Sequence, residues 1–279
     1  MNETPVNKFL KRRPTVVEAL ALAEVADTQK LFHLATELRD EGHSNLISYS
    51  RKIFIPLTKL CRDFCHYCAF AEAPEKQHRN FMTQDEVLEL VKQGEASGCK
   101  EALFTLGDKP ELRYRVAREE LASLGHKTTL SYLAEIAELV VSESKLLPHI
   151  NAGTMSAEDL RKLREVSVSQ GLMLESSSKR LCKKGGPHHG SQDKLPKIRL
   201  ETIRLAGVEK IPFTSGILIG IGETRLERIE SLLDLRKLNE QHGHLQEIII
   251  QNFRAKAGTQ MAYAQEPNLG ELVWTIAVA

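Results

Sequence analysis

Short apolar runs alternate with longer amphipathic segments along most of this chain. Runs of five to seven apolar residues bounded by turn residues predict strands, whereas apolar residues at intervals of three and four predict helices. We therefore predict six strands, at residues 52–57, 101–105, 147–151, 171–175, 213–219 and 247–252.

The segments between these strands have the signals of helices. Thr83 and Glu86 form a capping box that begins one helix, and Ser156 caps another. Before the first strand, residues 15–41 predict a leading helix with a break near Asp27 and a stop at Gly42. The remaining helices are expected near residues 112–124, 129–144, 194–206, 224–241 and 269–279.

Strands that alternate with helices indicate parallel pairing through right-handed crossovers. Six such units are too few to close an eight-fold barrel, so we predict an α/β fold, a partial (β/α)6 TIM-like barrel open on one side. We expect two regions, an N-terminal helical lead-in at residues 1–44 and a core domain at residues 45–279.

Composition narrows the class of protein. An apolar share of 42% is sufficient for a buried core, and a net charge of +1 argues against nucleic acid as the main partner. The chain has no apolar run long enough to span a membrane and no secretory signal. Five cysteines, an odd number, indicate a reducing compartment, so we expect a cytoplasmic protein.

Polar residues follow each predicted strand, at the edge where barrel-like α/β folds collect their chemistry. We therefore expect one shared site built from the loop after the first strand, Thr105–Asp108, Asn151, Glu175–Ser177, Gly220–Glu223 and Gln251–Asn252.

The loop after the first strand has three thiols, Cys61, Cys65 and Cys68. Thiolates are soft ligands that suit iron–sulfur clusters and zinc. Three thiols would leave one iron of a four-iron cluster for a non-protein ligand. The alternatives are a disulfide, or a closed zinc site, which needs four ligands and has only His66 close by.

The spacing C-x3-C-x2-C, with Tyr67 before the third cysteine, resembles the signature of radical S-adenosylmethionine (SAM) enzymes. This resemblance implies a barrel of the radical SAM type. It also implies a 4Fe-4S cluster held by Cys61, Cys65 and Cys68, with SAM chelating the open iron.

Longer stretches resemble one family within this superfamily. CRDFCHYC, EALFTLGDKPE, GGPHHGSQDK, PFTSGILIGIGET and QEIIIQNFRAKAGT are similar to the CofG-type subunit of FO synthase and to the matching half of the fused synthases. FO is 7,8-didemethyl-8-hydroxy-5-deazariboflavin, the chromophore of coenzyme F420. Members of that family continue beyond the position of Ala279, so this chain is expected to be shortened at its C-terminus.

The resemblance implies roles for residues around SAM. Tyr67 would pack near the adenine, Gly107 and Asp108 would receive the amino group, and Glu175 would accept from the ribose or amine. The G-x-I-x-G-x-x-E-like stretch, with Gly220 and Glu223, would contact adenine. Without the resemblance, each has an ordinary structural explanation. Tyr67 could be a core aromatic, Gly107 and Asp108 a strand-end turn, and Glu175 a surface carboxylate. The stretch with Gly220 could be a buried strand that contains glycine.

Candidates for the substrate follow from the same resemblance. Asn151, Gln251 and Asn252 are candidates for contacts with a uracil ring, and Arg254 is a further candidate. His188 and His189 are candidates for substrate contact or proton transfer, although loop histidines often have no such role.

The reaction implied is conversion of a tyrosine-derived adduct of 5-amino-6-(D-ribitylamino)uracil into FO, with hydrogen abstraction by a 5′-deoxyadenosyl radical and loss of ammonia. A CofH-type radical SAM enzyme would supply the adduct, and an electron donor would reduce the cluster. The alternatives are a CofH-like or menaquinone-pathway radical SAM enzyme, a non-catalytic Fe–S protein, or an inactive fragment.

Overall fold

The computed structural model describes residues 12–25, 28–74 and 79–279, so the break expected near Asp27 lies outside the described residues. Within them the chain forms a six-stranded sheet whose spatial order follows the sequence, β1-β2-β3-β4-β5-β6. Every neighbouring pair is parallel. The strands are β1 (Lys52–Ile55), β2 (Glu101–Thr105), β3 (Leu147–Asn151), β4 (Ser169–Gly171), β5 (Phe213–Ile219) and β6 (Leu245–Asn252).

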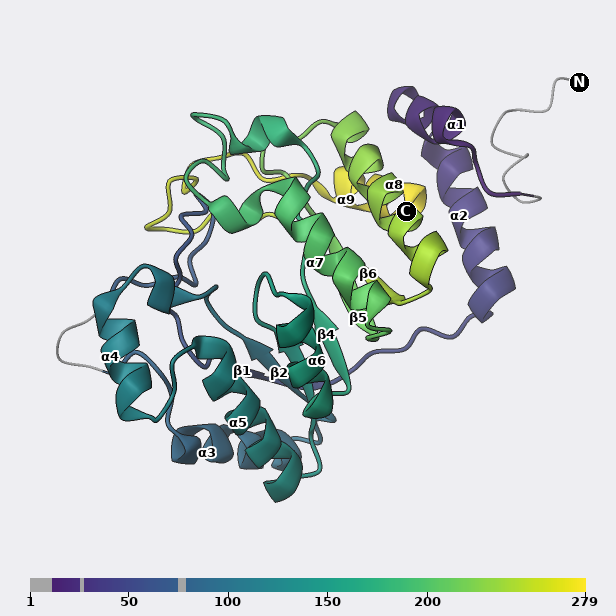
Figure 1. Cartoon of the computed structure of the whole chain (residues 1–279). Coiled ribbons are helices and arrows are strands. Elements are labelled where there is room, and N and C mark those ends of the chain that lie inside the picture. The colour runs from purple at the N-terminus through teal and green to yellow at the C-terminus, as the bar shows by residue number, and fades with distance from the viewer. Residues whose placement is uncertain (1–11, 26–27, 75–78) are drawn as a thin grey trace, which may run out of the picture.

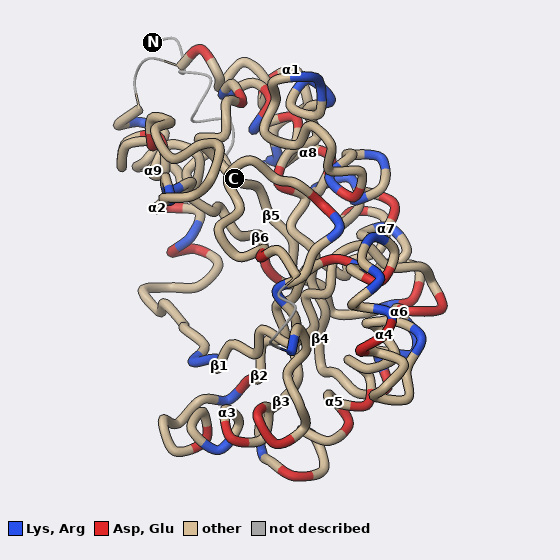
Figure 2. The backbone as a smooth tube through the Cα atoms, turned by 90° about the vertical axis from the view of Figure 1, so that its left-hand side faces the viewer, with Lys and Arg blue, Asp and Glu red and all other residues tan. Residues whose placement is uncertain are grey.

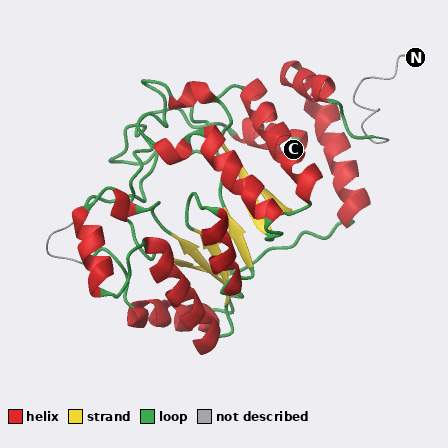
Figure 3. Cartoon of the chain, in the orientation of Figure 1, coloured by secondary structure: helices red, strands yellow, loops and turns green. Residues whose placement is uncertain are grey.

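Helices lie outside the strands (Figures 1 and 3). The capping box of Thr83 and Glu86 begins α3, and Ser156 caps α6, both as predicted. The α-helices are α1 (Val16–Ala21), α2 (Thr28–His43), α3 (Gln84–Ala96), α4 (Arg115–Ser123), α5 (Thr129–Glu143), α6 (Ala157–Glu165), α7 (Pro196–Val208), α8 (Arg225–His242) and α9 (Leu269–Val278). The 3-10 turns are η2 (Leu22–Glu24), η3 (Pro110–Leu112), η4 (Lys179–Cys182) and η5 (Gln192–Lys194).

The partial barrel predicted from the alternating pattern is confirmed. The described sheet ends at β1 and β6, which pair only with β2 and β5 respectively. On β6, Ile248 and Ile249 remain more than one-third exposed, as expected for an edge strand. The carboxyl ends of these parallel strands all meet at one edge of the sheet, where the predicted polar loops lie.

Three strand predictions were wrong in their limits. β1 ends at Ile55 rather than at residue 57, β4 covers 169–171 rather than 171–175, and β6 begins at Leu245 rather than at residue 247. After β4 the chain still follows β5, because Leu172 N donates to Thr214 O at 3.0 Å. Glu175, however, has φ +64° and pairs with β5 only through an isolated bridge, so the regular ladder cannot continue through it.

The N-terminal helices pack against the end of the chain. Leu31 and Leu34 of α2 form an apolar cluster with Ile229 of α8 and the fully buried Trp274 of α9. In Figure 2, acidic and basic residues alternate along the helices and loops, and the view shows no face of a single sign. Each helix in the described parts of the chain is too short or too polar to cross a bilayer.

Candidate functional site

The loop after β1 lies against the end of β2. Gly107 N donates to Thr58 O at 3.0 Å, and Arg62 N donates to Asp108 O at 3.1 Å. A Cβ atom on Gly107 would lie 1.8 Å from Leu60 O, so only glycine allows the two backbones this approach. Gly107 therefore determines how closely the cysteine loop packs against the end of β2.

All five cysteines are free. Asp108 N donates to Cys61 Sγ at 3.3 Å, and Ser191 Oγ donates to Cys65 Sγ at 3.6 Å. Burial raises the pKa of Cys61 to about 11 and also raises the pKa of Cys65. These groups stay thiols unless a cation binds them, and hydrogen-bond donors already face two of the sulfurs.

The thiols fit a cluster better than a single ion. Among the described residues, the one group of potential metal ligands within 4.8 Å of one another consists of Asp63, Asp108 and Asp193, without any cysteine. In this conformation the three sulfurs do not all lie within 4.8 Å of one another, so they do not form a preformed site for a single ion. Three soft donors on one loop, two of them with hydrogen-bond donors, suit a multi-iron core with one iron open.

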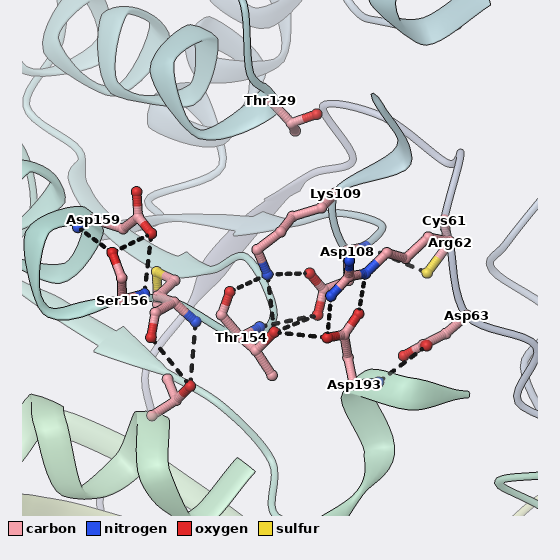
Figure 4. A network of polar contacts seen from close by, with 12 residues as sticks. Cys61, Arg62, Asp63, Asp108, Lys109, Thr129, Thr154, Ser156, Asp159 and Asp193 are labelled. Carbon is pink, nitrogen blue, oxygen red and sulfur yellow. Dashed lines mark hydrogen bonds and ion pairs between the residues drawn. The ribbon is translucent and has the colours of Figure 1, made fainter. Parts of the chain in front are cut away.

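A polar network joins the cysteine loop to three other strand ends (Figure 4). Arg62 forms a bidentate ion pair with the buried Asp193, donating through Nε and Nη2 to the two carboxylate oxygens. Lys109 Nζ donates to Asp108 Oδ1 at 2.7 Å and to Thr154 Oγ1 at 2.9 Å. Thr154 Oγ1 also donates to Asp193 Oδ1 at 3.1 Å. These two cations pair with Asp193 and Asp108, two of the three carboxylates, so these two have the geometry of a structural network.

Sequence reasoning missed most of this network. Arg62 lies within CRDFCHYC and Asp193 within GGPHHGSQDK, but neither was predicted as a site residue, and Thr154 lies in a third loop outside the quoted stretches. Asp108, predicted to face the SAM amino group, has Oδ2 accepting from Thr154 N at 2.9 Å and Oδ1 accepting from Lys109. Its role toward SAM stays a prediction.

Glu175 lies at the end of the β4 segment and is 7% exposed. Its Oε1 accepts from Lys194 Nζ at 2.6 Å and lies 3.8 Å from a guanidinium nitrogen of Arg199. Although burial opposes ionisation, these two cations lower the pKa of Glu175. Its Oε2 is buried and has no hydrogen-bond partner, which leaves a charged acceptor free for a ligand.

The half-buried Tyr67 pairs with the buried His188. The Tyr67 hydroxyl lies 3.0 Å from His188 Nε2, and the rings meet edge to face. Burial, followed by the charge of Lys194, lowers the pKa of His188 to about 3, so the ring is neutral at neutral pH. His189, its neighbour in the sequence, is exposed.

The glycine turn after β5 is held by its own glutamate. Glu223 accepts from Gly220 N at 2.8 Å and from Ile221 N at 2.9 Å. Its Oε1 also accepts from Arg228 Nε at 2.7 Å, and Arg228 in turn pairs with Glu271 of α9 at 2.7 Å. Ile221 belongs to an apolar cluster with Leu181, Leu218 and Phe253, and Tyr67 of the cysteine loop packs against this cluster.

Glu223→Gln should lower the free energy of unfolding by about 2 kcal/mol, because hydrogen bonds to a charged group are lost in a buried turn. The side chain of Glu223 is 1% exposed. Urea unfolding of the two proteins measures the difference. Glu230→Gln, on the exposed side of α8, is the matched control and should change stability by less than about 0.5 kcal/mol. Equal losses in the two variants would contradict this role for Glu223.

The predicted substrate residues differ in exposure. Asn151 is half-buried at the end of β3, opposite Thr105. Asn252 has a buried Oδ1 with no hydrogen-bond partner, again a free acceptor. Gln251 is exposed, and Arg254, 63% exposed, forms an ion pair with Glu266 at 2.5 Å. Their contacts with substrate remain predictions.

Comparison with known proteins identifies the family of this chain. The Radical SAM superfamily profile matches residues 55–235. FO synthase of Streptomyces avermitilis is 48% identical over 276 residues, which are 95% of this chain and 32% of that protein. The 7,8-didemethyl-8-hydroxy-5-deazariboflavin synthase of Methanopyrus kandleri is 45% identical over 234 residues, 84% of this chain and 70% of that protein.

The solved structures agree on the fold. The FeFe-hydrogenase maturase HydG from Carboxydothermus hydrogenoformans superposes with a TM-score of 0.75 at 20% identity, covering 98% of this chain and 61% of that one. The chain spans about a third of the length of the fused FO synthase and most of the Methanopyrus protein. The chain belongs to the radical SAM superfamily and, within it, to the family of 7,8-didemethyl-8-hydroxy-5-deazariboflavin synthases.

Proposed function

We propose that this chain forms FO, in coenzyme F420 biosynthesis, from the tyrosine-derived adduct of 5-amino-6-(D-ribitylamino)uracil, with loss of ammonia. The observation that carries the proposal is the combined site: three free thiols on one loop, and a buried carboxylate with an unused oxygen that is connected to this loop through Lys194 and Asp193. The 45% identity with the Methanopyrus synthase over 70% of its length supports the choice of product.

The cofactors would be a 4Fe-4S cluster and SAM. When bound, the reduced cluster supplies one electron that cleaves the C5′–S bond of SAM and releases a 5′-deoxyadenosyl radical. Cys61, Cys65 and Cys68 would hold the cluster and leave one iron for the SAM amino and carboxylate groups.

The protein groups around SAM would bind and orient it. Glu175 Oε2 is the free acceptor for a ribose hydroxyl or the amine. Tyr67 and Ile221 provide an apolar wall for adenine. Gly220 has φ +91°, and a Cβ there would lie 2.4 Å from Pro267 Cδ, so the turn requires glycine.

Substrate contacts would come from the ends of β3 and β6. Asn151 and Asn252 are half-buried, and the free Oδ1 of Asn252 suits a ring N–H of the uracil. His188 is neutral and bonded to Tyr67, so it would orient that ring rather than exchange protons near pH 7.

The proposed partners are the small-molecule substrate, a second radical SAM enzyme and an electron donor. A CofH-type radical SAM enzyme would supply the adduct, and a cytoplasmic electron donor would reduce the cluster. Nucleic acid and membrane are not among the proposed partners, in keeping with the net charge of +1.

Anaerobically reconstituted protein tests the proposal directly. With SAM, a reductant and the adduct, we expect 5′-deoxyadenosine and blue-green FO fluorescence to form together, because the radical must act on the bound adduct. Without the adduct, FO should be absent. Formation of 5′-deoxyadenosine without FO would overturn the substrate assignment, and absence of both would overturn the radical SAM activity.

A further inference from the structure

Residues 187–194, which we call the clasp, run along the cysteine loop in the opposite direction. Near its start, Pro187 O accepts from His66 N at 2.9 Å, and His188 contacts Tyr67. In the clasp's second half, Ser191 Oγ accepts from Phe64 N at 2.9 Å. Near its end, Asp193 pairs with Arg62, and its N–H donates to Asp63 Oδ1 at 3.3 Å.

The contacts follow one order along both segments. As the clasp runs forward, its contacts run backward along the cysteine loop. Residues 187 and 188 contact residues 66 and 67, residue 191 contacts residues 64 and 65, and residue 193 contacts residues 62 and 63. The residues between Cys61 and Cys65 and those between Cys65 and Cys68 all take part in these contacts. Two loops packed by chance would not form such a continuous run of hydrogen bonds and ion pairs. The clasp therefore sets the shape of the cysteine loop from outside it.

Ser191 makes the contact that bears on cluster chemistry. It is 3% exposed, and its hydroxyl oxygen already accepts from Phe64 N. The single hydroxyl proton is left to donate, and it points to Cys65 Sγ at 3.6 Å. A hydrogen bond to a ligating sulfur withdraws electron density and favours the reduced form of an iron–sulfur cluster.

The clasp also reaches the carboxylate proposed to bind SAM. Asp193 is bonded to Arg62 in the cysteine loop, and the next residue, Lys194, donates to Glu175 Oε1 at 2.6 Å. Two adjacent side chains thus connect the cysteine loop with Glu175. The connection from the cysteine loop to Glu175 therefore depends on Asp193 and Lys194 being adjacent in the clasp.

We propose that the clasp is a second half of the cluster site, and that Ser191 is a positioning residue that raises the reduction potential of the cluster through Cys65 Sγ. The proposal rests on the cluster assigned to the three cysteines under the proposed function. It adds a residue outside the cysteine loop that determines how readily the cluster accepts its electron.

Redox titration monitored by electron paramagnetic resonance tests this role in the reconstituted protein. Ser191→Ala should shift the reduction equilibrium about tenfold toward the oxidised cluster, a potential about 59 mV more negative for a one-electron couple. Ser191→Thr keeps the hydroxyl and should restore the wild-type potential. Ser142→Ala, which removes an exposed hydroxyl on α5, is the control and should leave the potential unchanged.

The outcomes separate this proposal from the proposed function. A wild-type potential in Ser191→Ala, or an equal shift in Ser191→Ala and Ser191→Thr, would overturn the role of Ser191 while leaving the cluster assignment intact. Absence of a cluster in the wild-type protein would instead overturn the proposed function. If Ser191→Ala does not fold, Ser191→Gly also lacks the hydroxyl and takes its place, with the same negative shift expected.

Discussion

Replacing Cys65 with Ala is expected to remove the visible absorption of the iron–sulfur cluster and to lower 5′-deoxyadenosine formation by more than about a hundredfold. Loss of one ligand exceeds the 10–100-fold effects that follow from removing groups that only support ligands. The remaining thiols, Cys61 and Cys68, offer too few sulfurs for a stable four-iron core. Iron content, absorption and 5′-deoxyadenosine are measured on the same anaerobic preparation.

Cys99→Ala is the matched control for this experiment. Cys99 is half-buried, packs against the main core and lies before β2, away from the cysteine loop. It should retain the cluster and SAM cleavage at wild-type levels. A Cys65→Ala protein that keeps both properties would show that the ligand assignment is wrong.

Gly107→Ala should also be severe, although it adds only a methyl group. The new Cβ would lie 1.8 Å from Leu60 O and 2.9 Å from Cys61 Cβ, so one backbone segment must move. We expect a loss of about 3 kcal/mol in the free energy of unfolding, at the upper end of overpacking effects. The displaced Cys61 should also lower iron incorporation several-fold.

Gly42→Ala isolates the steric effect from the general effect of replacing glycine. A Cβ at Gly42 meets nothing within 4 Å, and the residue lies in α2, where alanine is favoured by up to about 1 kcal/mol. Denaturant unfolding should therefore show slight stabilisation for Gly42→Ala and a large loss for Gly107→Ala. Similar stabilities for the two variants would contradict the close approach of β2 to the cysteine loop.

The order of elements was predictable because it depends on local signals. Each strand and most helices lie within a few residues of their predicted positions, and capping residues such as Thr83 and Ser156 placed the starts of α3 and α6. The limits of β4 were not predictable, because its start follows from pairing with β3 and β5, and the positive φ of Glu175 beyond it is reported by no hydrophobic pattern.

The candidate site was predictable only where chemistry is concentrated in a short motif. Three cysteines in one loop indicate a cluster without any tertiary information. Arg62, Ser191 and Asp193 were missed, because their significance arises from contacts between segments more than 100 residues apart. In the stretch GGPHHGSQDK the histidines were the predicted candidates, whereas in the structure its serine, Ser191, contacts a cysteine.

The ion pair between Arg228 and Glu271 connects the glycine turn after β5 with α9. Glu271 also pairs with Arg225 at 2.6 Å, so α9 holds two arginines of α8, one of which supports Glu223 beneath the glycine turn. Anything that pulls on α9 would therefore be transmitted to Gly220 and Ile221. The N-terminal helices share this connection, because Leu31 and Leu34 of α2 pack against Trp274 of α9.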